Sequence, residues 1–442
     1  MTMAGARDAF VQIGATRDGL DPYLHCARRR GMPAVLVETP AYLRWRRRLN
    51  RLPFDLELAV ADPDDTGQVG SALRAAQVVP ALVLAGFDRY VPTAFRFARA
   101  AHVAPWPYTG RHFTPVDKAR QRAALRRHAP EALQPGYVQV APAAVGTDGE
   151  EADGHGADGR GTYGPDLPAA LAFPQVVKPV DGAGGLGVTL VRNSAERALA
   201  LRDAAAAVNY GGAAFSGLLV EEHVPGTEYS VQGIAWDGRA RLLTFCEKVV
   251  LPERNGTLQG FRETCHLAAP GPAAPPGLTA LAQDCVSATG YAEGPFHVDV
   301  IKNDRGLFFI EMGFRLSGFG LEALVTRVSG LNWAEQAFAA HLERKAPGRP
   351  PDTGRRRPAA GQLLVTDPRQ LARAETLPAP QVHVQVSPPV PGPDGFTERE
   401  LAGLASDRRR HAAVLGRVTV EHDDPAWVHD RLLYCAGEEA GG

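Results

Sequence analysis

A lysine stands directly before a glycine-rich loop in residues 173–191, which read FPQVVKPVDGAGGLGVTLV. The apolar run predicts a buried strand that ends at Lys178, and glycines in the loop allow backbone N–H groups to close over a chain of phosphates. The lysine would place its charge on the α- and β-phosphates of a nucleotide. For this segment alone, a strand and a glycine-rich turn without a ligand is the alternative. The candidate phosphate-binding glycines are Gly184, Gly185 and Gly187.

Two carboxylates lie on neighbouring apolar runs in residues 296–320, which read FHVDVIKNDRGLFFIEMGFRLSGFG. The turn signal at 303–306 predicts two antiparallel strands that place Asp299 and Glu311 side by side. Two close carboxylates raise each other's pKa, and a divalent ion removes that cost. Hard oxygen ligands suit Mg²⁺, which shares its sites with substrate phosphates, and Mn²⁺ is an alternative. Arg315 could neutralise a phosphoryl group in transfer, so the two segments together predict an ATP-using enzyme.

A third candidate segment, residues 218–238, reads LLVEEHVPGTEYSVQGIAWDG and lies between the first two. A strand ends in paired glutamates, a Pro-Gly turn follows, and Glu228 opens another strand. Such a linker strand can pair with an adenine ring through its backbone groups, while Glu228 accepts hydrogen bonds from the ribose hydroxyls. In isolation, an exposed acidic turn is the alternative. The candidate nucleotide contacts are Glu221, Val224 and Glu228.

The overall composition excludes several classes of protein. The 442 residues suffice for two to four domains, and contents of 45% hydrophobic and 22% charged residues are ordinary for a soluble globular protein. A formal net charge of −1 indicates no nucleic-acid partner. The start MTMAGARDAF has no signal-peptide pattern, and no apolar run approaches the length of a membrane span. We therefore expect a cytoplasmic protein without a membrane partner.

The cysteines and lysines are informative by their number. Five cysteines without a CxxC pair indicate reduced thiols and no disulfide framework. Only five of the 48 basic residues are lysines, so each retained lysine is a candidate for a specific role. A tight phosphate pocket distinguishes a compact ammonium group from a planar guanidinium fork. The lysines are Lys118, Lys178, Lys248, Lys302 and Lys345.

Four apolar runs near the N-terminus alternate with helical stretches. They are residues 9–14, 34–37, 56–60 and 81–85. Strands that alternate with helices favour a small doubly wound parallel sheet. We therefore predict an α/β domain of Rossmann-like topology over residues 1–112.

The rest of the chain is divided by two segments that are rich in turn-forming residues. Residues 145–165 contain many glycines and aspartates, and we interpret them as a mobile insertion because their spacing fits no calcium loop. Residues 346–359 are interpreted as a linker. Short alternating runs at 382–386 and 417–421 then favour a small C-terminal α+β domain. A basic helix is predicted over residues 117–129.

The candidate segments, together with PVDKARQR at 115–122, resemble the ATP-grasp superfamily in their order and spacing. The resemblance implies an α+β ATP-grasp fold of two subdomains over residues 113–345, with a lid over about 118–217. It also implies that the C-terminal part, 346–442, completes the substrate site. Lys118 is implied as the second lysine on the nucleotide phosphates.

Within that superfamily, the chain is similar to carboxylate–amine ligases, including the L-amino acid (dipeptide) ligases. The similarity rests on TFCEKVV at 244–250 and FRETCHLAAP at 261–270, which match a substrate-pocket pattern of the form F-x-E-x-x-H…P. A strand-end histidine with a purely structural role is the alternative for His266. The substrate-pocket residues that the resemblance implies are Lys248, Glu263, His266, Arg315 and Gly318.

The resemblance implies a reaction in two steps. A substrate carboxylate attacks the γ-phosphate of ATP to give an acyl phosphate and ADP, and an amine then displaces phosphate. Arg315 would stabilise the acyl phosphate, and Gly318 would let the substrate approach the backbone. The implied substrates are amino acids or related amines, and many relatives of this kind are homodimers.

Two departures from the family pattern keep other functions open. Gly313 stands where the family often has an asparagine that binds metal, and Gly185 stands where it often has a serine. A second magnesium ion could therefore be held more loosely. An ATP-grasp enzyme with another acceptor, carboxylase-like or purine-biosynthetic, is one alternative, and a nucleotide-binding relative that has lost catalysis is another.

Overall fold

The structure is a computed structural model of the full chain. The insertion predicted at 145–165 and most of the linker predicted at 346–359 lie outside the part that it describes. For residues 254–255, 262–264 and 270 the structure describes the backbone alone. The described residues are 8–104, 116–142, 171–255, 257–270, 274–318, 320–348, 358–378 and 380–437.

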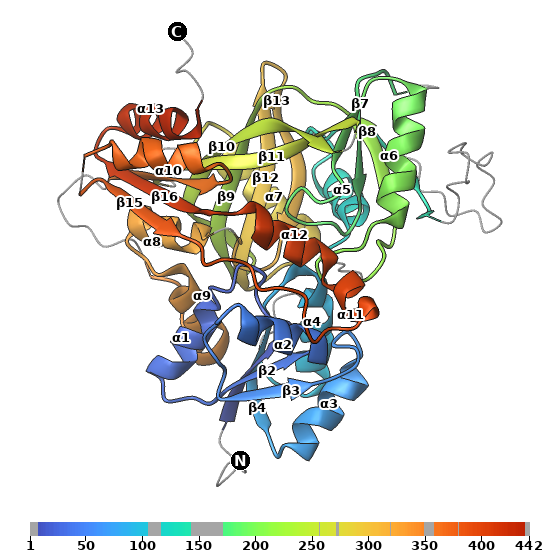
Figure 1. Ribbon diagram of the computed structural model, residues 1–442, viewed down its shortest axis with the longest axis vertical. Helices are drawn as coiled ribbons and strands as arrows, with labels where there is room; N and C mark the ends of the chain where they lie inside the picture. The colour runs from blue at the N-terminus through green and yellow to red at the C-terminus, as the bar shows by residue number, and fades with distance from the viewer. Residues whose placement is uncertain are drawn as a thin grey trace.

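The N-terminal part is a four-stranded parallel sheet of order β3-β2-β1-β4, which confirms the α/β prediction (Figure 1). Alternate residues of β1 face opposite layers of helices: Val11 packs with the α3–α4 side, and Phe10 packs with the α1–α2 side. The elements are β1 (Asp8–Ile13), α1 (Pro22–Arg29), β2 (Ala34–Glu38), α2 (Pro40–Arg48), β3 (Leu56–Ala59), α3 (Thr66–Ala75), β4 (Val79–Ala85), a 3₁₀ turn η1 (Asp88–Tyr90) and α4 (Val91–Ala100).

The rest of the chain builds one antiparallel sheet of twelve strands. Its main path has the order β13-β12-β9-β10-β11-β7-β6-β8-β5. In chain order its elements are α5 (Lys118–His128), β5 (Tyr137–Val140), β6 (Gln175–Pro179), β7 (Thr189–Val191), α6 (Ser194–Ala206), β8 (Leu218–Glu222), β9 (Thr227–Trp236), β10 (Arg239–Asn255), β11 (Leu258–Pro270), α7 (Leu278–Thr289), β12 (Gly294–Asn303), β13 (Gly306–Gly313), α8 (Leu321–Ser329) and α9 (Trp333–Glu343).

The C-terminal residues extend this sheet through the pairing of β14 with β11. The strand β16 then pairs with both β14 and β15, and its alternating burial places Val418 and Val420 in a small apolar core. The elements are β14 (Ala359–Val365), α10 (Pro368–Glu375), β15 (Val382–Val386), α11 (Glu398–Gly403), α12 (Ala405–Ala413), β16 (Gly416–His422) and α13 (Pro425–Ala436).

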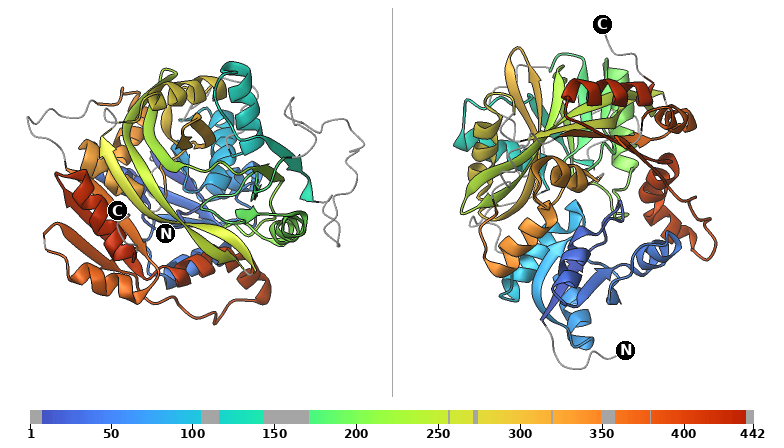
Figure 2. Two further views of the ribbon diagram at one scale, coloured as in Figure 1. Left: turned by 90° about the horizontal axis from the view of Figure 1, so that it is seen from above. Right: turned by 90° about the vertical axis from the view of Figure 1, so that its left-hand side faces the viewer.

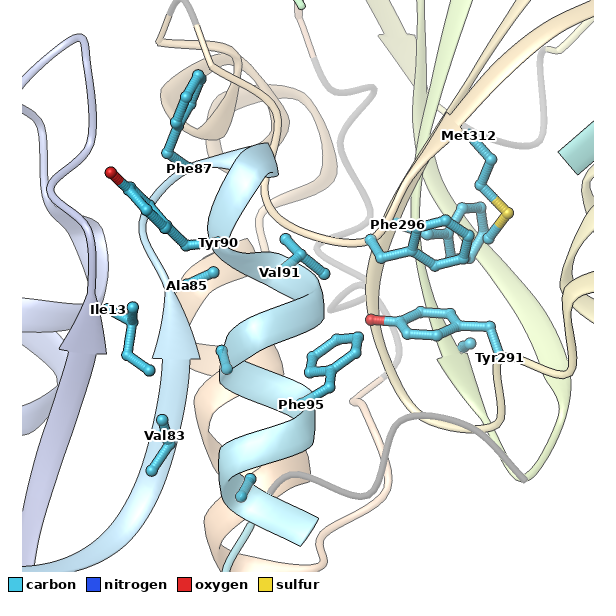
Figure 3. Packing of buried hydrophobic residues seen from close by; sticks show 14 of the residues in the cluster. Ile13, Val83, Ala85, Phe87, Tyr90, Val91, Phe95, Tyr291, Phe296 and Met312 are labelled. Carbon is cyan, nitrogen blue, oxygen red and sulfur yellow. The ribbon is translucent and has the colours of Figure 1, made fainter. Parts of the chain in front are cut away.

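The largest apolar core crosses from the N-terminal sheet into the large sheet. Figure 3 shows Val91 and Phe95 on α4 facing Phe296 and Tyr291, with Met312 of β13 on the far side. All five of these side chains are at most 5% exposed. Because buried apolar area stabilises whatever it joins, this core fixes the two sheets relative to each other.

The C-terminal residues also return to the N-terminal part. Figure 2 shows the chain after β15 crossing the molecule toward the N-terminal helices. There Trp45 on α2 donates a hydrogen bond of 2.8 Å to Asp407 on α12, and Arg44 pairs with Glu400 on α11. The C-terminal residues are thus tied to the N-terminal part as well as to the large sheet. No helix among the described residues is long and apolar enough to cross a membrane.

Candidate active site

A single cavity of about 1220 Å³ lies where the N-terminal loops, the large sheet and the C-terminal strands meet. Its lining includes the 181–188 loop, the connection between β8 and β9, the facing ends of β12 and β13, and parts of β15 and β16. Small-molecule sites usually measure about 300–1,000 Å³. The cavity is therefore large enough for more than one ligand.

Lys178 and Lys118 lie together at one end of this cavity. Lys178 is on the buried strand β6, and its ammonium group lies 2.6 Å from Glu221 Oε1 on the neighbouring strand β8. Lys118 is the first residue of α5, which begins there because the Asp117 side chain accepts a hydrogen bond from the Arg120 N–H. Its Nζ lies 2.7 Å from Glu311 Oε2. The two lysines that were predicted to bind phosphates therefore line the same cavity.

The glycine loop between β6 and β7 has the backbone that only glycine adopts readily. The φ angles of Gly184, Gly185 and Gly187 are 62°, 73° and 75°. Lys118 also donates a hydrogen bond of 2.6 Å to the carbonyl of Gly182 in the same loop. The loop therefore lies over the lysines, in the position expected for a phosphate cover.

Opposite charges at this end shift one another's pKa. Burial lowers the pKa of Lys178 to about 8, although Glu221 opposes that shift. Burial alone would raise the pKa of Glu311, but the Lys118 and Lys178 cations outweigh it and lower that pKa. The pKa of Glu221 is also lowered, because the cations Arg122 and Lys178 overcome its desolvation. The carboxylates are consequently anionic at neutral pH.

Asp299 and Glu311 face each other across the β12–β13 hairpin, as predicted. Lys248 on β10 lies 2.7 Å from Asp299 Oδ2 and 2.9 Å from Glu228 Oε1. Ser230 donates a hydrogen bond of 2.6 Å to Asp299 Oδ1. No group of three potential metal ligands occurs among the described residues, so these two carboxylates form a pair rather than a closed cage. A pair of hard oxygen donors beside a phosphate site suits Mg²⁺, which takes its remaining ligands from phosphates and water.

Gly313 lacks a side chain for a physical reason. A Cβ atom at that position would collide with the imidazole ring of His297, its partner across the hairpin. His297 lines the cavity, and its Nδ1 lies 3.3 Å from the carbonyl oxygen of Arg315. A histidine ring thus fills the space where the family's asparagine would stand.

The predicted adenine-binding segment also lines the cavity. Val224 is buried in its wall, and His223 stacks on Phe261 with 6.5 Å between ring centroids. The carboxylate of Glu221 is engaged by Lys178 and by Arg122 of α5. Glu221 is therefore held between two cations, and the nucleotide contacts predicted for Glu221, Val224 and Glu228 stay predictions.

Arg315 follows β13, the strand that carries Glu311, and pairs with Asp88 of the N-terminal part. A Cβ on Gly318 would lie 3.9 Å from both Arg315 Nη1 and Asp18 Oδ2, so the backbone at Gly318 is open to the cavity. Sequence reasoning missed Asp18 and Asp88, because neither belongs to a motif and each lies more than 200 residues before Arg315. It also missed Arg122, although that arginine stands within PVDKARQR.

The other predicted substrate residues are placed differently from one another. Lys248 lines the cavity. His266 pairs with Lys248 across β10 and β11 but is 0% exposed and is not among the cavity-lining residues. The backbone of Glu263 pairs with Val250, whereas its side chain lies outside the described ones. Direct substrate contact by Glu263 and His266 therefore stays a prediction.

Comparisons with known proteins agree with this geometry. Residues 171–322 match the family model of the ATP-grasp domain. Over 195 residues the chain is 32% identical to carnosine synthase 1 of Gallus gallus, a match that spans 41% of this chain and 20% of that protein. Over 146 residues it is 30% identical to dapdiamide A synthase of Enterobacter agglomerans, spanning 33% and 34% of the two chains. The chain thus matches a fifth of one relative's length and about a third of the other's.

Solved structures have the same fold over nearly the whole chain. The L-amino acid ligase of Bacillus licheniformis superposes with a TM-score of 0.64 at 17% identity, over 98% of both chains. A biotin carboxylase of Campylobacter jejuni superposes with a TM-score of 0.59 at 14% identity, over 98% of this chain and 91% of that one. Residues 171–322 therefore match an ATP-grasp domain, in agreement with the predicted resemblance, and the chain as a whole has the fold of these solved structures, which confirms the predicted fold class.

Proposed function

We propose that this protein is an ATP-dependent carboxylate–amine ligase that joins two amino acids, or an amino acid and a related amine, through an acyl phosphate. The observation that carries the proposal is one cavity that gathers two lysines, a carboxylate pair and Arg315, with volume for further substrates. The two curated relatives, both amide-forming synthases, support this choice within the superfamily.

The chain's own residues would act by position and charge. Lys118, Lys178 and the glycine loop hold the nucleotide phosphates, and Asp299 with Glu311 holds Mg²⁺, which neutralises phosphate charge when it is bound. Arg315 lies beside them and can neutralise the charge on the activated carboxyl group. No protein nucleophile is needed, because the substrate carboxylate attacks phosphorus and the amine then attacks carbon with loss of phosphate.

Binding of nucleotide and metal must exchange the ion pairs within the site. The ammonium groups of Lys118 and Lys178 now pair with Glu311 and Glu221. Lys118 and Lys178 would then turn to phosphate oxygens, and Glu311 would be free to serve as a magnesium ligand. Each of these buried charges would then keep an opposite partner both with and without ligands, which limits the desolvation cost.

The test is phosphate release from ATP and Mg²⁺ across all pairs of the twenty amino acids, with mass spectrometry of the active mixtures. We expect a product whose mass equals two amino acids minus water. Bicarbonate-dependent phosphate release without such a product would instead favour a carboxylase-like acceptor. ATP binding without any phosphate release would favour a relative that has lost catalysis. Mn²⁺ as a substitute metal, a homodimer and a cytoplasmic location complete the proposal.

A further inference from the structure

The cavity has a second basic end, which is built by the C-terminal strands. Arg417 on β16 pairs with Leu364 on β14 and with Gln385 on β15, so these three residues form one row across the small sheet. All three line the cavity. The next residue, Val418, points to the opposite face and is 0% exposed in the C-terminal core. The alternation of the strand therefore fixes the Arg417 side chain on the cavity face.

Arg417 differs from four other enclosed arginines of the structure. Arg17, Arg46, Arg122 and Arg315 each pair with a carboxylate, namely Glu38, Asp21, Glu221 and Asp88. Among the described residues, no carboxylate lies within 4.0 Å of the Arg417 guanidinium. Its Nε is buried and makes no hydrogen bond in the described structure, and the same holds for the Nε atoms of those four arginines. The missing carboxylate is therefore what separates Arg417 from them. A guanidinium held away from water normally has an anionic partner.

The electrostatics of Arg417 agree with that contrast. Burial lowers the pKa of Arg417, which Asp18 partly opposes and Arg410 reinforces. Gly320 lies against the guanidinium, because a Cβ atom there would collide with Arg417 Nη1. Arg315 therefore lies near Gly318 and Arg417 lies against Gly320, and Arg315 is the arginine nearer to Glu311. An anionic partner for Arg417 would therefore have to be a ligand that enters the cavity.

We infer that Arg417 binds a carboxylate of the amine-bearing substrate, so that this acceptor is an amino acid or another amino carboxylate rather than a simple amine. The inference rests on the proposed function. A guanidinium fork matches a carboxylate through two parallel hydrogen bonds. The Gln385 amide stands beside it in the same row and can donate a further one. The donor carboxylate reacts at the phosphate end, which leaves the carboxylate of the acceptor for Arg417.

The experiment separates donor activation from acceptor binding. With hydroxylamine as the amine, the hydroxamate formed reports the acyl phosphate alone. Amide formation is measured with an acceptor amino acid and with the decarboxylated amine of the same side chain. We expect Arg417→Ala to raise the KM for the acceptor amino acid about 100-fold, while hydroxamate formation and the KM for the decarboxylated amine remain unchanged. The KM of Arg417→Lys for the acceptor amino acid should lie between those of the wild-type protein and of Arg417→Ala, because lysine keeps the charge but lacks the planar guanidinium fork.

Arg369→Ala is the matched control, because Arg369 is 80% exposed, lies in the same C-terminal part and does not line the cavity. If Arg417→Ala lost amide formation equally with the acceptor amino acid and with the decarboxylated amine, the inference would be overturned in favour of a packing role for Arg417. Loss of hydroxamate together with amide would overturn it in favour of a role at the donor. If wild-type protein forms neither product with any donor, the proposed function itself fails, and the inference fails with it.

Discussion

The two ends of the cavity balance their charges in opposite ways. At the nucleotide end, Lys118, Lys178 and Lys248 each pair with a carboxylate of the large sheet. At the C-terminal end, Arg417 has no such partner among the described residues. The first end can therefore stay folded and neutral without a ligand. The second end keeps an unsatisfied cation that a substrate anion can satisfy, which gives it selectivity for charge.

The ends also differ in where their residues come from. The nucleotide end lies within residues 118–313, on strands that are largely consecutive in the antiparallel sheet. The other end combines Asp18 and Asp88 from the N-terminal part with Arg417 from near the C-terminus. Damage to local pairs should therefore affect the nucleotide, whereas damage to interdomain contacts should affect the acceptor.

The largest expected effect is at the carboxylate pair. Glu311→Gln removes a metal ligand and leaves Lys118 without its partner, so we expect turnover to fall about 1,000-fold. The fall in turnover is measured as the rate of phosphate release at a series of Mg²⁺ concentrations. Glu343→Gln, on a 41% exposed side chain at the end of α9, is the control. Wild-type turnover of the Glu311 variant at ordinary Mg²⁺ would contradict the metal role.

Lys178→Ala should act mainly on ATP binding. Loss of a buried charge–phosphate contact is expected to weaken ATP binding by about 3 kcal/mol, roughly 100-fold, and to abolish measurable turnover. Titration calorimetry measures the affinity, with the exposed Lys345→Ala as the control. If the Lys178 variant bound and turned over ATP normally, the phosphate assignment would be wrong.

The pKa of Lys178 gives the nucleotide end a pH dependence. Glu221, Glu311, Arg122 and Lys118 surround this lysine, and its pKa is about 8. Below that pH the side chain is charged and attracts phosphate, and above it the charge is lost, so ATP affinity should fall as pH rises through about 8, by at most about tenfold per pH unit. Lys178→Arg, which stays charged, should remove this fall. If ATP affinity fell with pH in the Lys178→Arg variant as it does in the wild type, a group other than Lys178 would be responsible for the pH dependence.

Gly313→Asn tests whether the family's asparagine can return. The new side chain would collide with His297, and we expect a loss of about 1–3 kcal/mol in the free energy of unfolding. The double variant with His297→Ala should recover most of that stability. Gly403→Asn is the control, because no atom lies within 4 Å of its added Cβ. Thermal unfolding measures the stability of all three variants. A Gly313→Asn protein as stable as the wild type would refute the steric explanation.

The smallest effect is expected at the contact between α2 and α12. Trp45→Phe removes the hydrogen bond to Asp407, which also receives one of 3.4 Å from Tyr42, and should cost about 1 kcal/mol of stability. We expect the acceptor KM to rise a few-fold because α12 carries Arg409 and Arg410 of the cavity wall, with the KM for ATP unchanged. A larger change in the ATP value than in the acceptor value would break the proposed division between the two ends.

The strands and motifs of the nucleotide end could be predicted from the sequence. Alternating apolar runs located β1 to β4, and the turn at 303–306 located the hairpin that pairs Asp299 with Glu311. These features depend on local preference and on neighbours in the sheet, which a sequence records directly. The lysines stood out because so few were present.

The C-terminal end could not be predicted in this way. Arg417 was part of a predicted strand, but nothing in that strand indicates that it extends the large sheet through β14 or that it faces the same cavity as Asp18. His266 matched a pocket pattern, yet the sheet buries it beside Lys248. The residues proposed to hold phosphate and metal could thus be chosen from local sequence patterns. Which distant charges meet around Arg417 could be seen only in the folded chain, because their meeting depends on packing between segments that are hundreds of residues apart.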